Sequence, residues 1–428
     1  MLVMGKVCVK VLGGGQEVGR SAILLEMENK KLLLDYGVML EEGSPKFPLS
    51  YPPKLIDAIV LTHAHLDHSG ALPMLYISTS KPLYTTRMTL SLSEILVRDF
   101  IKISGYYLPY EFRDFRNMVK NAVFVKSGEE VSLEKLSLRF SNAGHIPGSL
   151  SVSISSGDVN VLYTGDFNLI ETCLLRSADI DIKDMDVVII EGTYATFNHP
   201  RRDEVEKEFV ENVKEVIEND GNVLIPAFAV GRAQEIMCVL TKYNFGHKVY
   251  LDGMARAVTE ALLDDLEFVK NPRLFKKAYK KTIIVKGWED RRRAVKEPCV
   301  IISPAGMLKG GASVYYLRRL NKKKKNGLFF VSYQSKGTPG REILEEGAFT
   351  EGRKPIKVKA KVKWFDFSSH CGKRELEQLL KSADPSVKVI IVHSEKETGE
   401  LFRKYCEKEL GLETYFPRNG EELSLSIK

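Results

Sequence analysis

Long apolar segments are missing from this sequence. Among its 428 residues there is no run of about 18 or more consecutive apolar residues, which is the length that a membrane-spanning helix needs. The chain start, Met1 to Val7, leads directly into strand-like sequence, without the charged region and apolar stretch of a secretion signal. We therefore expect no membrane span, no secretion signal and a cytoplasmic location.

Paired cysteines and a strong charge of one sign are missing as well. No Cys-x-x-Cys pair of the kind that holds structural zinc or carries redox chemistry occurs. Six single cysteines, expected to be reduced and partly buried, stand at Cys8, Cys173, Cys238, Cys299, Cys371 and Cys406. The net charge of +7, from 63 basic and 56 acidic residues, indicates a polyanionic partner only weakly.

The residues that are present suit a globular protein of two to three domains, and 44% of them are hydrophobic. Short apolar runs alternate with turn residues from Val7 to Val60 and predict a β-meander. A second strand-rich stretch follows from Ala122 to Tyr163. The uninterrupted apolar run from Val187 to Ile190 predicts a buried strand that ends at Glu191.

The pattern changes to alternating helices and strands after Glu191. Arg201 to Glu218 has helical spacing and dense charge, and buried-type strands separated by helical stretches follow it. These strands are expected at residues 222–226, 249–251, 299–302 and 328–331. The alternation predicts a smaller α/β domain with a mostly parallel sheet.

Strand signals return at Val362, with a helix predicted at about Lys373 to Ser382 and a strand at Val387 to Val392. The prediction is therefore an outer domain in two parts, residues 1–194 and 361–428, with an inserted domain at residues 195–360. No internal repeat interrupts this organisation, and Lys322 to Lys325 is the only low-complexity run.

Histidine is scarce, with eight residues in the chain, yet three of them lie within six residues. His63, His65, Asp67 and His68 directly follow the predicted strand Ala58 to Leu61. On a strand-to-loop turn these side chains can converge, whereas an exposed helix would separate His63 from His65. Imidazole nitrogens and carboxylate oxygens are ligands that zinc prefers. An ordinary polar loop does not account for this concentration, so the run predicts a metal site.

Three further residues are candidate ligands for a second metal ion, because one four-residue cluster cannot fill two coordination spheres. His145 lies on a Gly/Pro loop, and Asp166 and His393 each end a predicted strand. Each of them alone is more typical of a buried histidine or a turn aspartate. Together with the first cluster they favour a two-metal site.

The order of these residues is similar to the sequence motifs of a known family. Asp35, His63-x-His65-x-Asp67-His68, His145 and Asp166 resemble the four motifs of the metallo-β-lactamase superfamily. Glu191, His370 and His393 resemble the three further motifs of its β-CASP branch. That branch contains ribonuclease J, the endonuclease subunit of the messenger-RNA cleavage and polyadenylation complex, and archaeal relatives of that subunit. The resemblance covers nearly the whole chain.

The resemblance implies an α/β fold, a metallo-β-lactamase αββα sandwich with an inserted smaller α/β (β-CASP) domain. It also implies two Zn²⁺ ions, with Mn²⁺ or Fe²⁺ as substitutes. One ion would be held by His63, His65 and His145, the other by Asp67, His68 and His393, with Asp166 bridging the two. Asp35 would orient a ligand histidine.

The function implied by the resemblance is hydrolysis of RNA phosphodiester bonds, leaving a 5′-phosphate and a 3′-hydroxyl. Asp67, Asp166, Glu191 and His370 would be the catalytic residues. The last motif is a histidine in RNA-acting members and typically a valine in DNA-acting ones, so His393 favours RNA. Both endonuclease and 5′-to-3′ exonuclease activities remain open.

The sequence is also compatible with other functions. They are a DNA-acting or small-molecule metallohydrolase of the same superfamily, and a non-catalytic RNA-binding subunit. The chain also departs from the usual Ser-Ala-His-Ala-Asp motif, because Cys371 and Gly372 follow His370. The role of the replaced acid is therefore open.

RNA contacts are expected at the loops of the inserted domain, although tight structural turns explain these loops equally well. The candidate contacts are Arg232, Ser303, Gly306, Lys309, Lys336 and Arg341. The Lys322 to Lys325 run is more typical of a solvated loop than of an RNA contact.

Assembly and the chain ends give three more expectations. The family start at Gly13 to Ser21 lies so near the N-terminus that no separate RNA-binding KH domain is expected before it. Leu423 to Ile427 alternates in polarity and predicts an edge strand or an interface strand. Family members often pair, so a homodimer is expected.

Overall fold

The computed structural model describes residues 5–40, 44–104, 108–157, 159–351 and 354–427. Residues 1–4, part of the start on which the absence of a secretion signal was predicted, lie outside them. The chain divides into two compact units. Unit 1 comprises residues 1–171, 177–198 and 369–428, and unit 2 comprises residues 172–176 and 199–368. No helix formed by the described residues is long and apolar enough to cross a membrane.

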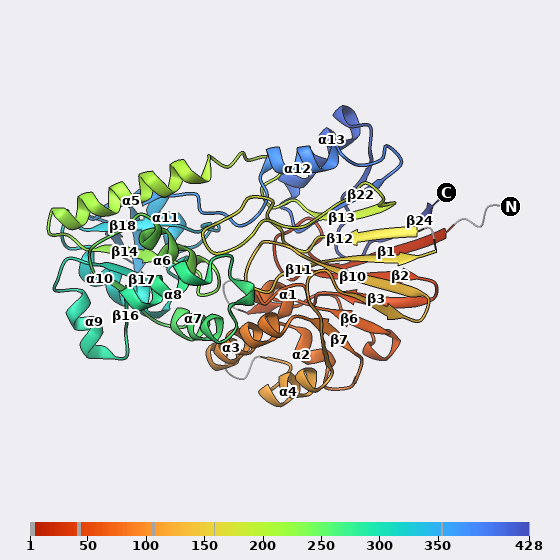
Figure 1. Cartoon of the computed structure of the whole chain (residues 1–428), viewed down its shortest axis with the longest axis horizontal. Coiled ribbons are helices and arrows are strands. Elements are labelled where there is room, and N and C mark those ends of the chain that lie inside the picture. The colour runs from red at the N-terminus through yellow and green to blue at the C-terminus, as the bar shows by residue number, and fades with distance from the viewer. Residues whose placement is uncertain (1–4, 41–43, 105–107, 158, 352–353, 428) are drawn as a thin grey trace. The chain divides into compact units, whose positions relative to one another are not determined.

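Two seven-stranded sheets form the centre of unit 1 (Figure 1). The first has the spatial order β24 (Glu422–Ile427), β1 (Gly5–Gly13), β2 (Ala22–Met27), β3 (Lys30–Leu34), β6 (Ala58–Val60), β7 (Leu83–Thr85) and β8 (Ala122–Phe124). The second has the order β23 (Glu413–Tyr415), β22 (Lys388–Val392), β13 (Val187–Glu191), β12 (Val159–Tyr163), β11 (Leu150–Ser156), β10 (Leu136–Asn142) and β9 (Glu130–Leu133). A small hairpin pairs β4 (Met39–Leu40) with β5 (Pro45–Lys46).

Apolar side chains on the facing sides of the two sheets form the central core of unit 1. The outer face of the first sheet is covered by helices that share a second core with it, and the outer face of the second sheet has its own helices and core (Figure 1). The first group is α1 (Leu66–Ser69), α2 (Leu72–Leu75), α3 (Arg87–Ser104) and α4 (Phe112–Lys120). The second group is α12 (Lys373–Leu380) and α13 (Lys396–Glu409). The order helix, sheet, sheet, helix confirms the predicted αββα sandwich.

Unit 2 is built on one parallel sheet of six strands. Its spatial order is β16 (Thr282–Ile284), β15 (Val249–Leu251), β17 (Val300–Ser303), β14 (Val223–Pro226), β18 (Gly327–Phe330) and β21 (Lys361–Trp364). Continuous apolar strands such as Val-Ile-Ile in β17 are typical of parallel sheets covered on both faces. The prediction of a mostly parallel insert is therefore confirmed.

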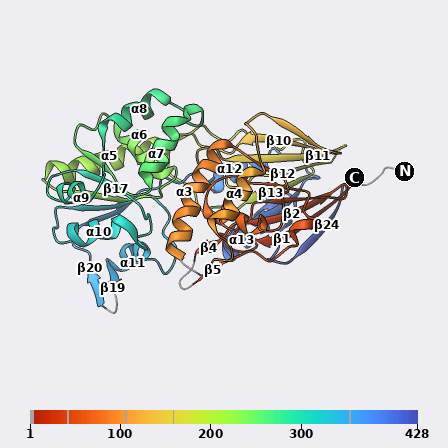
Figure 2. The same ribbon diagram turned by 90° about the horizontal axis from the view of Figure 1, so that it is seen from below.

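Helices lie on both faces of the sheet of unit 2 (Figure 2). One face carries α5 (Arg202–Glu218), α6 (Arg232–Lys242), α7 (Ala255–Asp264) and α8 (Pro272–Lys281). The other carries α9 (Trp288–Ala294), α10 (Gly311–Leu320) and α11 (Pro339–Glu346), together with the hairpin β19 (Ala348–Glu351) and β20 (Lys354–Lys357). Short 3-10 helices occur at Pro53–Leu55 and Leu266–Phe268.

Residues 172–176 belong to unit 2, although they fall within the predicted first part of the outer domain. The cause is a buried carboxylate on α6. Glu235 accepts hydrogen bonds from the backbone N–H groups of Cys173 and Leu174, at 3.0 and 2.7 Å. Arg202, the first residue of α5, also donates to Glu235 at 2.8 Å, so the carboxylate that holds the segment is itself fixed by an ion pair.

Candidate metal centre

The candidate ligands come from loops that follow parallel strands. In the first sheet β3 and β6 are parallel neighbours, so Asp35 and the loop with His63 leave the same edge. In the second sheet β12, β13 and β22 are parallel neighbours, and Asp166, Glu191 and His393 stand at or just beyond their ends. This topology brings residues that are distant in sequence to one place.

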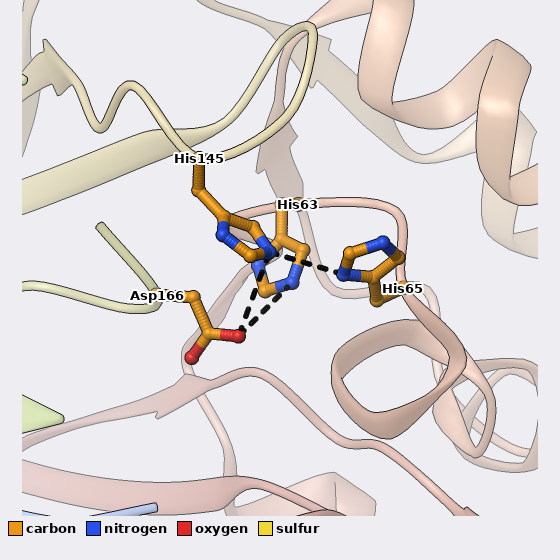
Figure 3. A group of neighbouring side chains, drawn as sticks. All are labelled: His63, His65, His145 and Asp166. Atoms are coloured by element: carbon orange, nitrogen blue, oxygen red, sulfur yellow. Dashed lines mark hydrogen bonds and ion pairs between the residues drawn. The ribbon is translucent and has the colours of Figure 1, made fainter. Parts of the chain in front are cut away.

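All seven predicted ligands are brought together in unit 1. Their nitrogen and oxygen atoms form overlapping groups in which ligand atoms lie within 4.8 Å of one another. One group is His63, His65, His145 and Asp166, shown in Figure 3. Two others are His63, Asp67 and His68, and His68, Asp166 and His393. Asp67 and His68 stand on the helical turn α1 and not on the predicted loop.

Asp166 divides its two carboxylate oxygens between the two predicted ligand sets. Its Oδ2 lies 3.6 Å from His63 Nε2 and 3.7 Å from His145 Nε2 (Figure 3). Its Oδ1 lies 3.3 Å from His68 Nε2 and 3.3 Å from His393 Nδ1. One oxygen therefore faces each set, which is the geometry that a bridging carboxylate needs.

The remaining two ligands complete the two sets. His65 Nδ1 lies 3.1 Å from His145 Nε2, next to the oxygen that faces the first set. Asp67 Oδ2 lies 3.4 Å from His393 Nε2, in the second set.

Burial keeps several of these histidines uncharged. It lowers the pKa of His63 and His145 well below the ordinary value, and that of His65 to about 4. Burial opposes ionisation of Asp166, but the charges of His393 and His68 hold its pKa well below the usual range. The neutral imidazoles of His63, His65 and His145 beside the ionised Asp166 are in the protonation states in which these groups ligate a metal. The pKa values of His68 and His393 are instead raised, because burial is outweighed by the charge of Asp166.

The donor set also fits a metal because buried atoms in it lack hydrogen bonds. His63 Nε2 and Asp166 Oδ1 are both buried, and neither has a hydrogen-bond partner among the described residues. A polar atom buried without a partner is costly. Imidazole nitrogens and carboxylate oxygens that converge on a common position suit a divalent ion such as zinc.

Asp35 is fully buried and holds the metal loop from behind. Its carboxylate lies 2.8 Å from His68 Nδ1 and accepts from the backbone N–H and the hydroxyl of Thr62, both at 2.8 Å. The hydroxyl of Tyr163 donates to it at 2.9 Å. Asp35 therefore presents His68 Nε2, and not Nδ1, to Asp166.

The loop from Gly13 to Ser21, between β1 and β2, supports the site through its backbone. The N–H of Ser21 donates to the carbonyl of Asp67 at 2.7 Å, and the N–H of His393 donates to the carbonyl of Gly14 at 2.7 Å. This loop therefore connects the positions of two of the three ligands of the second set, Asp67 and His393.

Glu191 and His370 form a pair beside the ligands. His370 Nδ1 lies 2.8 Å from Glu191 Oε1, and its ring centre lies 4.5 Å from that of His145. Burial favours the neutral imidazole, but the charge of Glu191 and the hydrogen bond to it raise the pKa of His370 to about 9. The side chain is 19% exposed, so a charged donor at the rim of the cluster is accessible from outside.

Sequence reasoning missed several residues that orient the site. Thr193 Oγ1 lies 3.1 Å from His393 Nδ1, and the carbonyl of Ser369 lies 2.9 Å from His145 Nδ1. Tyr163 and Thr62 act through Asp35 as described above. Thr62, Tyr163, Thr193 and Ser369 all stand within one to three residues of a predicted ligand or catalytic residue, and that proximity is the signal that could have found them.

Three family models match the chain. They are the metallo-β-lactamase superfamily at residues 15–227, the β-CASP domain at 233–343 and the Zn-dependent metallo-hydrolase RNA specificity domain at 355–417. A protein of Saccharolobus solfataricus named RNase aCSPSF2 is 45% identical over 97% of this chain and 85% of its own length. This chain is a β-CASP member of the metallo-β-lactamase superfamily.

Other relatives of this β-CASP protein carry different names. A Methanocaldococcus jannaschii protein named probable RNase MJ4 is 35% identical, over 96% of this chain and 99% of its own length. A Pyrococcus abyssi protein named transcription termination factor FttA is 35% identical, over 97% and 70%. A crystal structure of an Enterococcus faecalis V583 protein of unknown function shares the fold, with a TM-score of 0.62 and 15% identity over 98% and 100% of the two chains.

The departure from the β-CASP motif after His370 has a local explanation. Gly372 is the N-cap of α12, with extended backbone angles, and its N–H donates to Glu375 Oε2 at 3.1 Å. An aspartate there would cap the helix. Glycine is also accepted at N-caps and lowers helix stability by only about 0.3 kcal/mol relative to a capping side chain. Cys371 is buried, and its Sγ accepts from the N–H of Leu169 at 3.3 Å.

The predicted RNA contacts of the β-CASP domain differ in how exposed their side chains are and in whether they are already paired. Lys309 and Lys336 are exposed, and Arg232 is the first residue of α6. The guanidinium of Arg341 is paired with Glu345 at 2.6 Å. Ser303 is fully buried and donates its hydroxyl to the carbonyl of Pro304, so it does not offer that hydroxyl to RNA.

Proposed function

We propose that this β-CASP protein is a metal-dependent ribonuclease that hydrolyses RNA phosphodiester bonds with two Zn²⁺ ions, for which Mn²⁺ or Fe²⁺ can substitute. The observation that carries the proposal is the division of the two oxygens of Asp166 between two sets of histidines. The match to the RNA specificity domain and the ribonuclease names of two relatives support RNA as the substrate.

The residues present fit two divalent ions. His63, His65 and His145 would hold one, and Asp67, His68 and His393 the other, with Asp166 between them. When bound, such ions activate water and neutralise charge on the attacking and leaving oxygens at phosphorus. Attack by water leaves a 5′-phosphate and a 3′-hydroxyl.

The side chains of the chain itself do the orienting and the proton handling. Asp35 keeps the Nε2 of His68 turned toward Asp166. His370, held by Glu191, donates a hydrogen bond to a non-bridging phosphate oxygen, where negative charge develops in the transition state. Glu191 is 2% exposed and accepts from the N–H groups of Phe167 and Thr193, at 3.2 Å each, so its position is set before RNA binds.

RNA, rather than DNA or a small molecule, is the substrate that these features favour. His393 stands where DNA-acting relatives typically carry valine, and the second unit offers exposed Lys309 and Lys336 to a long polyanion. Both internal cleavage and 5′-to-3′ trimming are compatible with this centre. We further propose that the chain acts as a homodimer.

Labelled and circular RNA test the proposal. Incubation with circular RNA, with 5′-labelled RNA, with a DNA of the same sequence and with a panel of thioesters separates the candidate activities. We expect RNA products with 5′-phosphate ends and far slower cleavage of DNA. Cutting of circles establishes internal cleavage, and release of mononucleotides from a 5′-phosphate end establishes trimming. Thioester hydrolysis without RNA cleavage would contradict the proposal.

A further inference from the structure

An exposed tryptophan on unit 2 is the starting point. Trp288, the first residue of α9, is 59% exposed and is one of only two tryptophans in the chain. Apolar side chains that are exposed singly are common, but tryptophan is enriched at binding interfaces, so the charged and aromatic neighbours of Trp288 decide whether it marks a site.

Trp288 has both kinds of neighbour. The ring of Tyr315 on α10 packs against it edge to face, with ring centres 5.2 Å apart. The guanidinium of Arg291 lies 4.9 Å from the centre of Trp288, and that of Arg319 lies 3.8 Å from the centre of Tyr315. We call Trp288, Arg291, Tyr315 and Arg319 the α9–α10 cluster.

A buried carboxylate holds the cluster in position. Asp252 is 1% exposed and accepts two hydrogen bonds from Arg291, at 2.7 and 3.0 Å. It accepts a third from the hydroxyl of the buried Tyr316 at 2.8 Å. Because Arg291 is anchored in this way, the Trp288 ring lies against a fixed partner. A base that stacks on Trp288 therefore does not have to order that side chain first.

The charge of α10 and of the segment that follows it, up to Arg341, is of one sign. The sequence between Glu297 and Glu342 contains no acidic residue. Its basic residues are Lys309, Arg318, Arg319, Lys322, Lys323, Lys324, Lys325, Lys336 and Arg341. The exposed run Lys322 to Lys325 directly follows α10, the helix that carries Tyr315 and Arg319. Two acids lie on α9: Glu289, which directly follows Trp288 and is exposed, and Asp290, which accepts from the N–H of Lys286 at 2.8 Å and lies 3.8 Å from Arg293.

A similar pair in unit 1 provides a contrast. Arg98 lies 3.7 Å from the ring centre of Phe112, nearly the same distance as Arg319 from Tyr315. However, Arg98 donates to Glu94 at 2.6 Å, so its charge is neutralised within its own helix. Arg319 has no ion pair among the described residues, and its guanidinium donates to the carbonyl of Tyr315 at 3.5 Å.

We propose that the α9–α10 cluster is a binding site for single-stranded RNA. Bases stack on Trp288 and Tyr315, and Arg319 and the lysine run contact the phosphates. Stacking on aromatic faces combined with a cationic strip binds single strands with little sequence preference. This inference rests on the proposed function, because the bound RNA is taken to be the substrate. The cluster would hold a segment of that RNA away from the phosphate that is cleaved.

Tryptophan fluorescence tests the site separately from catalysis. In the full chain with His370→Ala, which is expected to slow RNA cleavage, Trp364→Phe leaves Trp288 as the only tryptophan. We expect an oligouridylate of about 20 nucleotides, longer than the strands that such surfaces usually hold, to quench this emission. The companion chain with Trp288→Phe, which retains Trp364, should show no comparable quenching.

The RNA affinity of matched variants is a second, independent test of the site. Trp288→Ala should weaken oligouridylate binding about ten-fold, within the range for losing one stacked base. Arg319→Glu should weaken it as well, because a phosphate contact is replaced by a like charge. Arg319→Glu should also reduce the salt dependence of binding, by about 0.7 in the logarithmic slope for each lost phosphate contact. Arg98→Glu, the matched charge reversal in unit 1, should change the affinity less than two-fold.

Three outcomes would overturn the site. They are a Trp288 emission unchanged at saturating RNA, equal weakening by Arg98→Glu and Arg319→Glu, and a Trp288 emission that changes with protein concentration but not with RNA. The last would identify an interface between copies of the chain. Quenching by RNA in a chain whose wild type cleaves no RNA would retire the proposed function and leave this site standing. RNA cleavage without quenching would support the proposed function and contradict this binding site.

Discussion

Asp166 is the residue on which the two ligand sets depend. The sequence predicts it as a ligand only through the family order, because a lone aspartate at a strand end is common. The structure adds that its two oxygens face different histidines, at 3.3 to 3.7 Å. No residue pattern could predict that division, since it depends on how strands from two sheets meet.

Replacing this bridging residue should remove both sets at once. We expect Asp166→Ala to abolish RNA hydrolysis and to lower the metal content of the purified protein together, because both sets lose a shared ligand. Metal analysis beside an RNA cleavage assay measures the two quantities. Full hydrolysis in a metal-free Asp166→Ala chain would contradict the two-metal reading.

His370 should behave differently, because it contacts the ligand cluster without belonging to it. His370→Ala is expected to retain the metal content of the wild type and to slow turnover at least about a hundred-fold, the usual effect of losing one transition-state donor. A single-turnover cleavage assay measures the rate. Normal turnover in this variant would remove His370 from the catalytic residues.

At the scale of elements, strands were easier to predict than the segments that connect them. The continuous apolar runs of β13, β14 and β22 are visible in the sequence, and the helix α12 begins where its pattern does. The turn α1 was missed, because a four-residue helix has too few positions to show helical spacing. It nevertheless carries Asp67 and His68.

The role of Glu235, which accepts from the backbone of residues 172–176 and pairs with Arg202 of α5, is testable through stability. The pKa of Glu235 is lowered: burial opposes ionisation, but Arg202 and the backbone N–H groups of Cys173 and Leu174 outweigh it. Its contribution to stability is therefore present above the ordinary value of 4.5 and is lost as the pH falls below it. We expect Glu235→Gln to reduce unfolding free energy near neutral pH by about 3 kcal/mol.

Denaturant unfolding at several pH values measures this loss. The difference between Glu235→Gln and wild type should shrink as the pH is lowered below 4.5. Glu211→Gln, an exposed position on the neighbouring helix α5, serves as the control and should change stability by no more than about 0.5 kcal/mol. Equal effects of the two substitutions would refute the anchoring role.

Gly399 in α13 shows that packing outweighs helix propensity. Alanine in a helix is more favourable than glycine by about 1 kcal/mol, but a Cβ at this position would lie 2.1 Å from Cζ of Phe416. Overpacking of that kind costs about 1–3 kcal/mol. Gly399→Ala should therefore lower the melting temperature, and adding Phe416→Leu should recover part of the loss. A stabilised Gly399→Ala chain would show that the ring moves freely.

At the scale of the whole molecule, the family and the αββα fold with its inserted domain could be predicted, because ordered motifs survive in the sequence. Two features could not. The transfer of residues 172–176 to unit 2 depends on a buried pairing with Glu235. The α9–α10 cluster depends on Trp288 and Tyr315, from separate helices, meeting in space. Contacts between separate elements leave no periodic signal in a single sequence.

The central claim is that bound divalent metal at this centre enables RNA cleavage. The most direct measurement is RNA hydrolysis by wild-type protein stripped of metal with a chelator and then given back Zn²⁺, with metal counted at each step. We predict that activity disappears in the stripped protein and returns as about two ions per chain are bound. Undiminished RNA hydrolysis by protein shown to contain no metal would contradict the account.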